Sequence, residues 1–369
     1  MAGNKSLNKA KDAKLDEFYT QRSDIENELA HYAHHFKDKV VYCNCDDPVE
    51  SEFWKFFVRN FKPWGLKKLI ATHYEPDEKN YSYSLEICED TNGDGRIDMN
   101  DEPTITQLPC NGDFRSAACI ELLKEADIVV TNPPFSLFRE YMAQLMEYRK
   151  KFVIIGSINA LKYKDIFPYI KNNQIWMGAT MFNGGAAYFM GDPSLYDPAK
   201  MSNPKHAYVK DGVFYWRVNG VRWYTNLDIP QRHRPMDFRG NYYKPELYPR
   251  YYNFDAIDVS KVEDIPCDYD GLMGVPISLM DKYCPEQFEI IDRGNDVPKT
   301  LTHESINGEW IVYKDHDGNV VWKTPYTVAE RKAGNSLRLD DNGKPGKLPY
   351  DRIIIRLRNP EPRRYPDDN

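Results

Sequence analysis

Short apolar runs alternate with amphipathic segments over the first half of the chain. The apolar runs are rich in Val and Ile, as buried strands are, and the segments between them repeat their apolar positions every three or four residues, as helices do. The expected strands are 39–45, 66–72, 127–131 and 151–157, and the expected helices are 23–36, 49–61, 116–126 and 136–149. This alternation predicts an α/β fold with a doubly wound, mostly parallel sheet.

The rhythm changes after residue 178, where Gly, Pro and aromatic residues become frequent. A loop-rich insert is therefore expected there, before the main fold returns with a strand and a helix near 268–291 and a last strand at 350–358. The start of the chain is rich in Lys, Asn and Ala, which predicts a mobile arm. The predicted division is an arm at 1–15, the first part of the α/β domain at 16–178, an insert at 179–262, and the returning α/β domain with its C-terminal strand and tail at 263–369.

Composition narrows the class of protein. The 369 residues suffice for one large domain or two ordinary ones. The seven cysteines show no C-x-x-C pair, so neither a disulfide framework nor a zinc site is indicated, and no metal is assigned. The N-terminus has no apolar segment like that of a signal peptide, and no apolar run reaches the length of a bilayer crossing. We therefore expect a soluble, cytoplasmic protein without a membrane partner.

The charge is distributed unevenly. A formal net charge of −7 argues at first against a nucleic-acid partner, because Lys and Arg bind phosphate. Between Lys205 and Arg250, however, nine Lys or Arg residues stand against four Asp or Glu. This stretch is also rich in aromatic residues, and arginine is the commonest partner of guanine in the major groove. We predict that it contacts DNA, and the candidate residues are Arg217, Arg222, Arg232, Arg234 and Arg239. A solvated insert with a small aromatic core is the alternative.

The sequence Asn132-Pro133-Pro134-Phe135 directly follows the expected strand 127–131. Proline fixes its own φ and restricts the residue before it, so Asn132 and Pro133 are held extended. The Asn132 amide oxygen and the Pro133 carbonyl can then accept both N–H bonds of a planar amine, which favours the tetrahedral form whose lone pair attacks an electrophile. Phe135 offers a face on which a base outside the duplex can stack.

A turn that ends a strand would use the same residue types. The position of the four residues argues for a ligand site instead, because ligands of open α/β sheets bind outside the carboxyl ends of the strands. These residues are the predicted catalytic group.

The sequence resembles the EcoRI-type adenine-N6 DNA methyltransferases. The resemblance is carried by "TNPPFSLF" after "GDFRSAACIELLKEADIVV", by "DEFYTQ" and "KVVYCNCDDP" near the start, and by "DYDGLMGVP" and "CPEQFEII" later. It implies a methyltransferase fold of the S-adenosylmethionine-dependent type, in which the insert reads the DNA target. The implied reaction is site-specific methylation at N6 of an adenine flipped out of double-stranded DNA, within a restriction-modification system.

The same resemblance assigns cofactor residues. "DEFYTQ" places Phe18, Tyr19 and Thr20 near the methionine end of S-adenosylmethionine. "GDF" places Asp113 at the amino group of the cofactor's adenine and Phe114 against its ring.

The first expected strand ends in "CNCDDP" and lacks the glycine-rich turn that many methyltransferases have there. Asn44, Asp46 and Asp47 are therefore the candidates for the methionine ammonium or the ribose. Glu75 is the nearest candidate for a ribose-binding acid, and an ordinary surface glutamate is the alternative.

Residues 90–101, "DTNGDGRIDMND", match much of a calcium-loop pattern. Asp101 replaces the bidentate glutamate of that pattern, and the flanking segments are expected to be strands rather than helices. The tip of a β-hairpin would use the same residue types, and both interpretations stay open.

Other functions share parts of this pattern. A methyltransferase acting on an RNA base or a protein glutamine would keep the amine chemistry, and a catalytically silent DNA-binding relative would keep only the recognition surface. The expected partners are double-stranded DNA and a cognate restriction endonuclease, and the expected state is a monomer.

Overall fold

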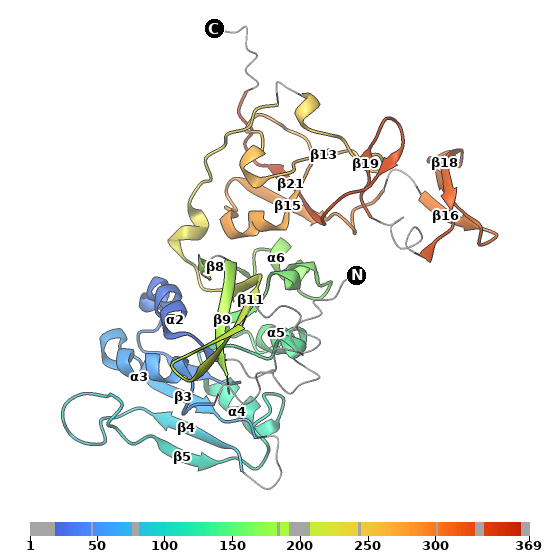
Figure 1. Ribbon diagram of the computed structural model, residues 1–369. Coiled ribbons are helices and arrows are strands. Elements are labelled where there is room, and N and C mark those ends of the chain that lie inside the picture. The colour runs from blue at the N-terminus through green and yellow to red at the C-terminus, as the bar shows by residue number, and fades with distance from the viewer. Residues whose placement is uncertain are drawn as a thin grey trace. The chain divides into compact units, whose positions relative to one another are not determined.

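The computed structural model describes residues 19–45, 47–75, 81–182, 185–191, 207–242, 245–299, 302–328 and 336–362. The chain forms two compact units, Met1–Ile229 and Pro230–Asn369. The first runs from blue to yellow in Figure 1 and the second from yellow to red. The arm predicted at 1–15 lies outside the described residues.

An eight-stranded sheet forms the centre of the first unit, with the strand order β5-β4-β3-β2-β6-β7-β12-β8. Its strands are β2 (Val40–Cys43), β3 (Lys68–Thr72), β4 (Tyr83–Ile87), β5 (Thr104–Gln107), β6 (Ile128–Thr131), β7 (Lys151–Ser157), β8 (Trp176–Met181) and β12 (Val221–Thr225). The four central strands β3, β2, β6 and β7 pair in parallel, and the strands on both sides of them pair antiparallel. The predicted α/β sheet is therefore present, with its parallel part confined to the centre.

The chain reverses its direction of winding between β2 and β6. After β2 it forms β3 on one side, and it later returns to form β6 on the other side of β2. In a doubly wound sheet this reversal opens a crevice at the carboxyl ends of the two strands. Asn44 follows β2 and Asn132 follows β6, so both lie at this switch point.

Helices precede, connect and follow the strands of the central sheet along the chain. They are α2 (Arg22–Leu29), α3 (Glu52–Trp64), α4 (Ala117–Glu125), α5 (Phe138–Glu147) and α6 (Phe167–Lys171). Helix α3 begins after Ser51, whose side chain accepts a hydrogen bond from the Phe53 N–H, and ends at Gly65, where φ is 65°. Its aromatic face, including Phe53 and Phe57, is buried in the main core with residues of β2 and β3.

A second, four-stranded sheet in this unit has the order β1-β9-β11-β10. Its strands are β1 (Tyr19–Thr20), β9 (Ala186–Gly191), β10 (Ala207–Lys210) and β11 (Val213–Asn219). Thr20 pairs with Phe189, so the start of the described chain is joined to a segment about 170 positions later. Three strands of this sheet, β9, β10 and β11, lie within the predicted loop-rich insert, as does β12 of the central sheet, so the insert is not confirmed as a loop over these strands.

The burial of the side chains along β11 and β12 explains why these segments form strands rather than loops. In β11, Phe214 and Val218 are buried and alternate with more exposed residues. In β12 all five residues are buried, because β12 lies between β7 and β8. Trp223 therefore packs in the core, with its ring 5.3 Å from that of Phe182.

The described residues of the second unit form three sheets. The largest has the order β13-β14-β21-β15, and the others are β16-β17-β18 and β19-β20. The strands are β13 (Ile257–Asp258), β14 (Met273–Pro276), β15 (Phe288–Arg293), β16 (Thr302–Ile306), β17 (Trp310–Lys314), β18 (Val320–Pro325), β19 (Leu339–Asp340), β20 (Pro345–Gly346) and β21 (Arg352–Leu357). The predicted strands near 268–291 and at 350–358 are thus present, and among the described residues they pair with each other in a sheet of their own. The helix predicted after the first of them is only a short 3-10 helix, Ile277–Lys282, and the strand β15 follows it. The structure divides the chain after Ile229, whereas the sequence prediction divided it after residues 178 and 262.

Among the described residues, no helix combines the length and apolar character needed to span a bilayer.

Asp24, in the first turn of α2, gives the fold a pH dependence. The side chain is buried, and this burial raises the pKa of Asp24 from its ordinary value of 3.8 to about 6. Since the unfolded chain releases this proton more readily, the folded state loses stability as the pH rises from about 4 to about 6. We expect Asp24→Asn to remove this loss and to raise the free energy of unfolding at pH 7. Urea unfolding of both proteins at pH 4 and pH 7 measures it, and an equal difference at both pH values would contradict the prediction.

Candidate functional site

The carboxyl ends of β2 and β6 are joined by a side-chain contact. Thr131, the last residue of β6, donates its hydroxyl hydrogen bond to the backbone carbonyl of Asn44. Both residues are buried. The predicted catalytic segment and the predicted cofactor residue Asn44 therefore lie side by side at the switch point.

Tyr141 of α5 holds the Asn44 side chain. Its hydroxyl donates to the Asn44 Oδ1 atom at 2.5 Å, and burial raises the pKa of Tyr141 well above its ordinary value, which keeps the hydroxyl protonated. The Tyr141 ring also meets the edge of Phe114, with centroids 5.0 Å apart. Sequence reasoning missed Tyr141, because it is one of many aromatic residues at helical spacing.

The predicted catalytic residues form a stiff turn into α5. Asn132 and Pro133 are buried, and Pro134 has φ −55° and ψ 122°. The Leu137 N–H donates to the Pro134 carbonyl at 2.9 Å, which closes the short 3-10 turn that begins at Phe135. The turn therefore fixes the backbone of all four residues between β6 and α5.

Phe135 connects this turn to the amino-terminal motif. Its partly buried ring lies nearly perpendicular to that of Phe189, with centroids 6.3 Å apart, and Phe189 is the strand partner of Thr20. Thr20 is 2% exposed, and its Oγ1 atom has no hydrogen-bond partner among the described residues. Phe18 and the side chain of Tyr19 lie outside the described part of the chain, so their predicted roles stay predictions.

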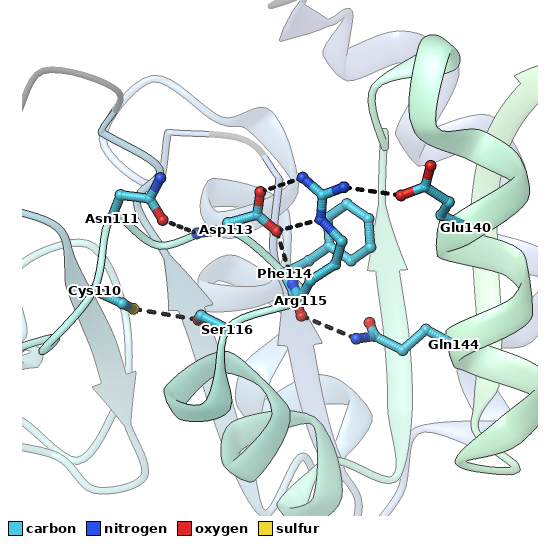
Figure 2. Close-up of polar contacts among 8 residues, drawn as sticks. All are labelled: Cys110, Asn111, Asp113, Phe114, Arg115, Ser116, Glu140 and Gln144. Atoms are coloured by element: carbon cyan, nitrogen blue, oxygen red, sulfur yellow. Dashed lines mark hydrogen bonds and ion pairs between the residues drawn. The ribbon is translucent and has the colours of Figure 1, made fainter.

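The predicted adenine-binding residues lie in a loop that leads into α4 (Figure 2). The Asp113 carboxylate accepts from the N–H, Nε and Nη2 of Arg115, and Arg115 lowers the pKa of Asp113. Phe114 is buried, and its carbonyl accepts from the Gln144 side chain at 3.0 Å. Figure 2 shows Arg115 between Asp113 and Glu140, to which it donates at 2.8 Å.

Gly112 brings this loop close to the end of β3. Its φ is +80°, and a Cβ atom there would lie 2.1 Å from the His73 carbonyl oxygen. Only glycine allows both this backbone conformation and this approach. The "GDF" segment is thus pressed against the carboxyl edge of the sheet.

The remaining acidic candidates surround His73. The Asp47 Oδ2 atom lies 2.9 Å from His73 Nδ1, and the Glu75 Oε2 atom lies 3.7 Å from Nε2. The His73 ring stacks on Tyr83 with centroids 4.9 Å apart. The structure therefore brings Asp47 and Glu75 together at the ends of β2 and β3, while Asp46 lies outside the described residues.

Cys45 occupies the position of the missing glycine. Its φ is 70°, a left-handed conformation that non-glycine residues rarely adopt. The turn after β2 therefore has a glycine-like backbone without a glycine. The sequence alone could not show this.

The predicted DNA-binding arginines are divided between the two units. Arg217 is half-buried in β11, with its guanidinium 5.8 Å from the centre of the Tyr188 ring, and Arg222 is buried in β12, where it donates to the Val221 carbonyl. In the second unit, Arg232 is half-buried, and Arg234 and Arg239 are exposed.

The loop 90–101 joins the antiparallel strands β4 and β5, as the hairpin interpretation predicted. Its carboxylates accept backbone hydrogen bonds: Asp90 from Gly93 and Gly95, and Asp101 from Thr91 and Asp98. Within the described ranges, no group of three or more His, Cys, Asp or Glu side chains is arranged to hold a metal ion.

Comparison with known proteins gives a family match along most of the chain. The family described as "Adenine-specific methyltransferase EcoRI" matches residues 6–358. The Type II methyltransferase M.EcoRI of Escherichia coli is 46% identical over 296 residues, covering 79% of this chain and 89% of the relative. The Type II methyltransferase M.MpnI of Mycoplasma pneumoniae is 41% identical over 289 residues, covering 78% of this chain and 85% of the relative. No solved structure gives a significant match.

Proposed function

The chain belongs to the EcoRI family of adenine-specific methyltransferases, and from this premise we propose that it transfers a methyl group from S-adenosylmethionine to N6 of an adenine flipped out of double-stranded DNA. The protein is thus a type II DNA methyltransferase. The observation that carries the proposal is the position of Asn132 and Pro133 at the switch point of the sheet, beside Asn44. The alternative substrates, an RNA base or a protein glutamine, gain no support from the relatives.

The residues around the switch point fit S-adenosylmethionine. Asp113 and Phe114 would hold the adenine, Asp47 or Glu75 the ribose, and Asn44 and Thr20 the methionine end. The buried Thr20 Oγ1 atom, which lacks a partner among the described residues, suits a polar ligand at this place. When bound, the cofactor supplies an electrophilic methyl carbon on a sulfonium.

The catalytic step follows from two fixed acceptors. The Asn132 amide oxygen and the Pro133 carbonyl would each accept one N–H bond of the target amine, which turns its lone pair away from the base ring and toward the methyl carbon. Phe135 would stack on the base once it has left the duplex. The buried strand β6 and the turn closed by Leu137 keep these groups in place before the substrate arrives.

We assign DNA recognition to residues 179–262 and place the phosphate contacts on the exposed Arg234 and Arg239, with further contacts from Arg232 in the same unit and from Arg217 in the first unit. Arg222 requires a change of conformation to reach DNA, because it is 7% exposed. We also propose that the protein acts as a monomer and that a cognate restriction endonuclease cleaves the same DNA site.

Arg234→Ala and Arg239→Ala should each weaken DNA binding. A lost phosphate contact removes one released counterion, so the slope of log affinity against log salt should decrease by about 1. Fluorescence anisotropy with a labelled duplex at several salt concentrations measures this. Lys344→Ala is the control, since it removes an exposed charge from the turn between β19 and β20. Equal slopes for all four proteins would place recognition elsewhere.

One assay tests the reaction itself. Full-length protein is incubated with plasmid DNA and S-adenosylmethionine labelled in its methyl group, and the DNA is digested to nucleosides. Label in N6-methyldeoxyadenosine supports the proposal. Label only in added RNA or protein, or DNA binding without any label, would refute it.

A further inference from the structure

Arg115 contacts three residues, Asp113, Phe114 and Glu140, although its side chain is half exposed. Its backbone N–H and its Nε atom donate to Asp113 Oδ1 at 2.8 and 2.9 Å, and its Nη2 atom donates to Asp113 Oδ2 at 2.7 Å. Its Nη1 atom donates to Glu140 Oε2 at 2.8 Å, and its guanidinium carbon lies 5.3 Å from the centre of the Phe114 ring. A two-pronged guanidinium fixes the plane of a carboxylate, which a single lysine ammonium does not.

These contacts leave a defined acceptor on Asp113. A carboxylate offers about two acceptor directions on each oxygen. Among the described residues, Oδ1 accepts two hydrogen bonds from Arg115, whereas Oδ2 accepts one. The side chain remains 21% exposed, so a ligand can reach the remaining direction on Oδ2. Asp113 can therefore accept one more N–H bond, from a fixed direction, while it stays bound to Arg115.

The Arg115 guanidinium is also held by α5, through its third nitrogen, Nη1. Glu140 belongs to the same helix as Tyr141, which holds Asn44, and Gln144, which holds the Phe114 carbonyl (Figure 2). This helix begins at Phe138, directly after the turn that carries Asn132 to Phe135. One helix therefore anchors the loop of Asp113 and Phe114, the turn after β2 and the predicted catalytic segment.

We propose that Arg115 is a positioning residue, which orients the Asp113 carboxylate so that Oδ2 accepts the exocyclic amine of the cofactor's adenine. Glu140 acts through Arg115, because it contacts the guanidinium and not Asp113. The inference rests on the proposed function, since it needs an adenine-bearing cofactor beside Asp113. The lowered pKa of Asp113, caused by Arg115, keeps the carboxylate charged and able to accept.

Calorimetric titration of the full-length protein tests this role with two probes. S-adenosylhomocysteine carries the exocyclic amine, and S-inosylhomocysteine carries a carbonyl oxygen in its place. A site built to accept an N–H bond rejects the second ligand, because two acceptors then face each other. We expect the wild-type protein to prefer S-adenosylhomocysteine by about 100-fold.

Arg115→Met should weaken binding of S-adenosylhomocysteine by about 10-fold and reduce the preference by a similar factor. The affinity and the preference of Arg115→Lys should lie between those of the wild-type protein and those of Arg115→Met, because an ammonium keeps the charge but not the two-pronged geometry. Glu140→Gln should weaken binding by about 3-fold, and adding it to Arg115→Met should have no further effect. Arg139→Gln is the matched control, because it breaks the neighbouring exposed ion pair of α5, to Asp165, and should leave both affinities unchanged.

The outcomes separate the two proposals. If the wild-type protein binds neither probe, the proposed function itself fails. If it prefers S-adenosylhomocysteine and Arg115→Met keeps the same affinity and preference, the role of Arg115 is refuted while the function stands. Additive effects of Arg115→Met and Glu140→Gln would refute the action of Glu140 through Arg115.

Discussion

Replacing Asn132 by alanine is expected to lower the rate constant of methyl transfer by about 100- to 1,000-fold, the usual cost of removing one preorganised hydrogen-bonding group from a transition state. The amide oxygen is needed while the amine attacks and not while the cofactor binds. Affinity for S-adenosylhomocysteine should therefore change little. Single-turnover methylation of plasmid DNA measures the rate, and calorimetry measures the affinity.

A matched control for this variant is Asn172→Ala. Asn172 is exposed and follows α6, outside the site. Its turnover should equal that of the wild-type protein. If Asn132→Ala kept the wild-type rate, or if it lost cofactor binding and rate together, the assigned role of the amide would be wrong.

The second large effect is expected on stability. Asp258 and Arg352 form an ion pair in the second unit, with 2.8 Å between Arg352 Nε and Asp258 Oδ1 and 3% of each side chain exposed. The Tyr251 hydroxyl also donates to Asp258 Oδ1 at 2.6 Å. Because Asp258→Ala leaves a buried guanidinium without its partner, we expect it to reduce the free energy of unfolding of this unit by about 3–5 kcal/mol.

Hydrogen exchange of the amides of β21 measures this loss in the second unit alone. Glu289→Gln is the control, because it breaks an exposed ion pair to Arg356 of the same strand. Exposed pairs contribute only about 0–1 kcal/mol, so this variant should exchange almost like the wild-type protein. Equal protection in both variants would show that the buried pair does not stabilise the sheet.

The sequence was sufficient to locate the parallel centre of the sheet and to place the segment Asn132 to Phe135 at the carboxyl end of one of its central strands. Both predictions rest on local signals, namely strands of Val and Ile between amphipathic helices, and two prolines directly after a strand. The hairpin character of residues 90–101 followed in the same way from its flanking strands. The assigned roles of the site residues remain predictions.

The contacts that hold the site together could not be predicted, because they join residues far apart in the chain. Tyr141 reaches Asn44 and Arg115 reaches Glu140 only after the sheet has brought α5 beside two loops. Cys45 adopts a backbone conformation that its residue type does not suggest. Trp223 is a core residue, although its surroundings in the sequence favoured a recognition surface, because β12 inserts between two strands that precede it in the chain.

The most direct test of the central claim is a crystal structure with S-adenosylhomocysteine. We predict that its sulfur lies at the switch point beside Asn44, facing Asn132 and Pro133, and that its adenine amine meets Asp113 Oδ2. An analogue bound elsewhere, with residues 132–135 sealed from it by the protein interior, would contradict the account.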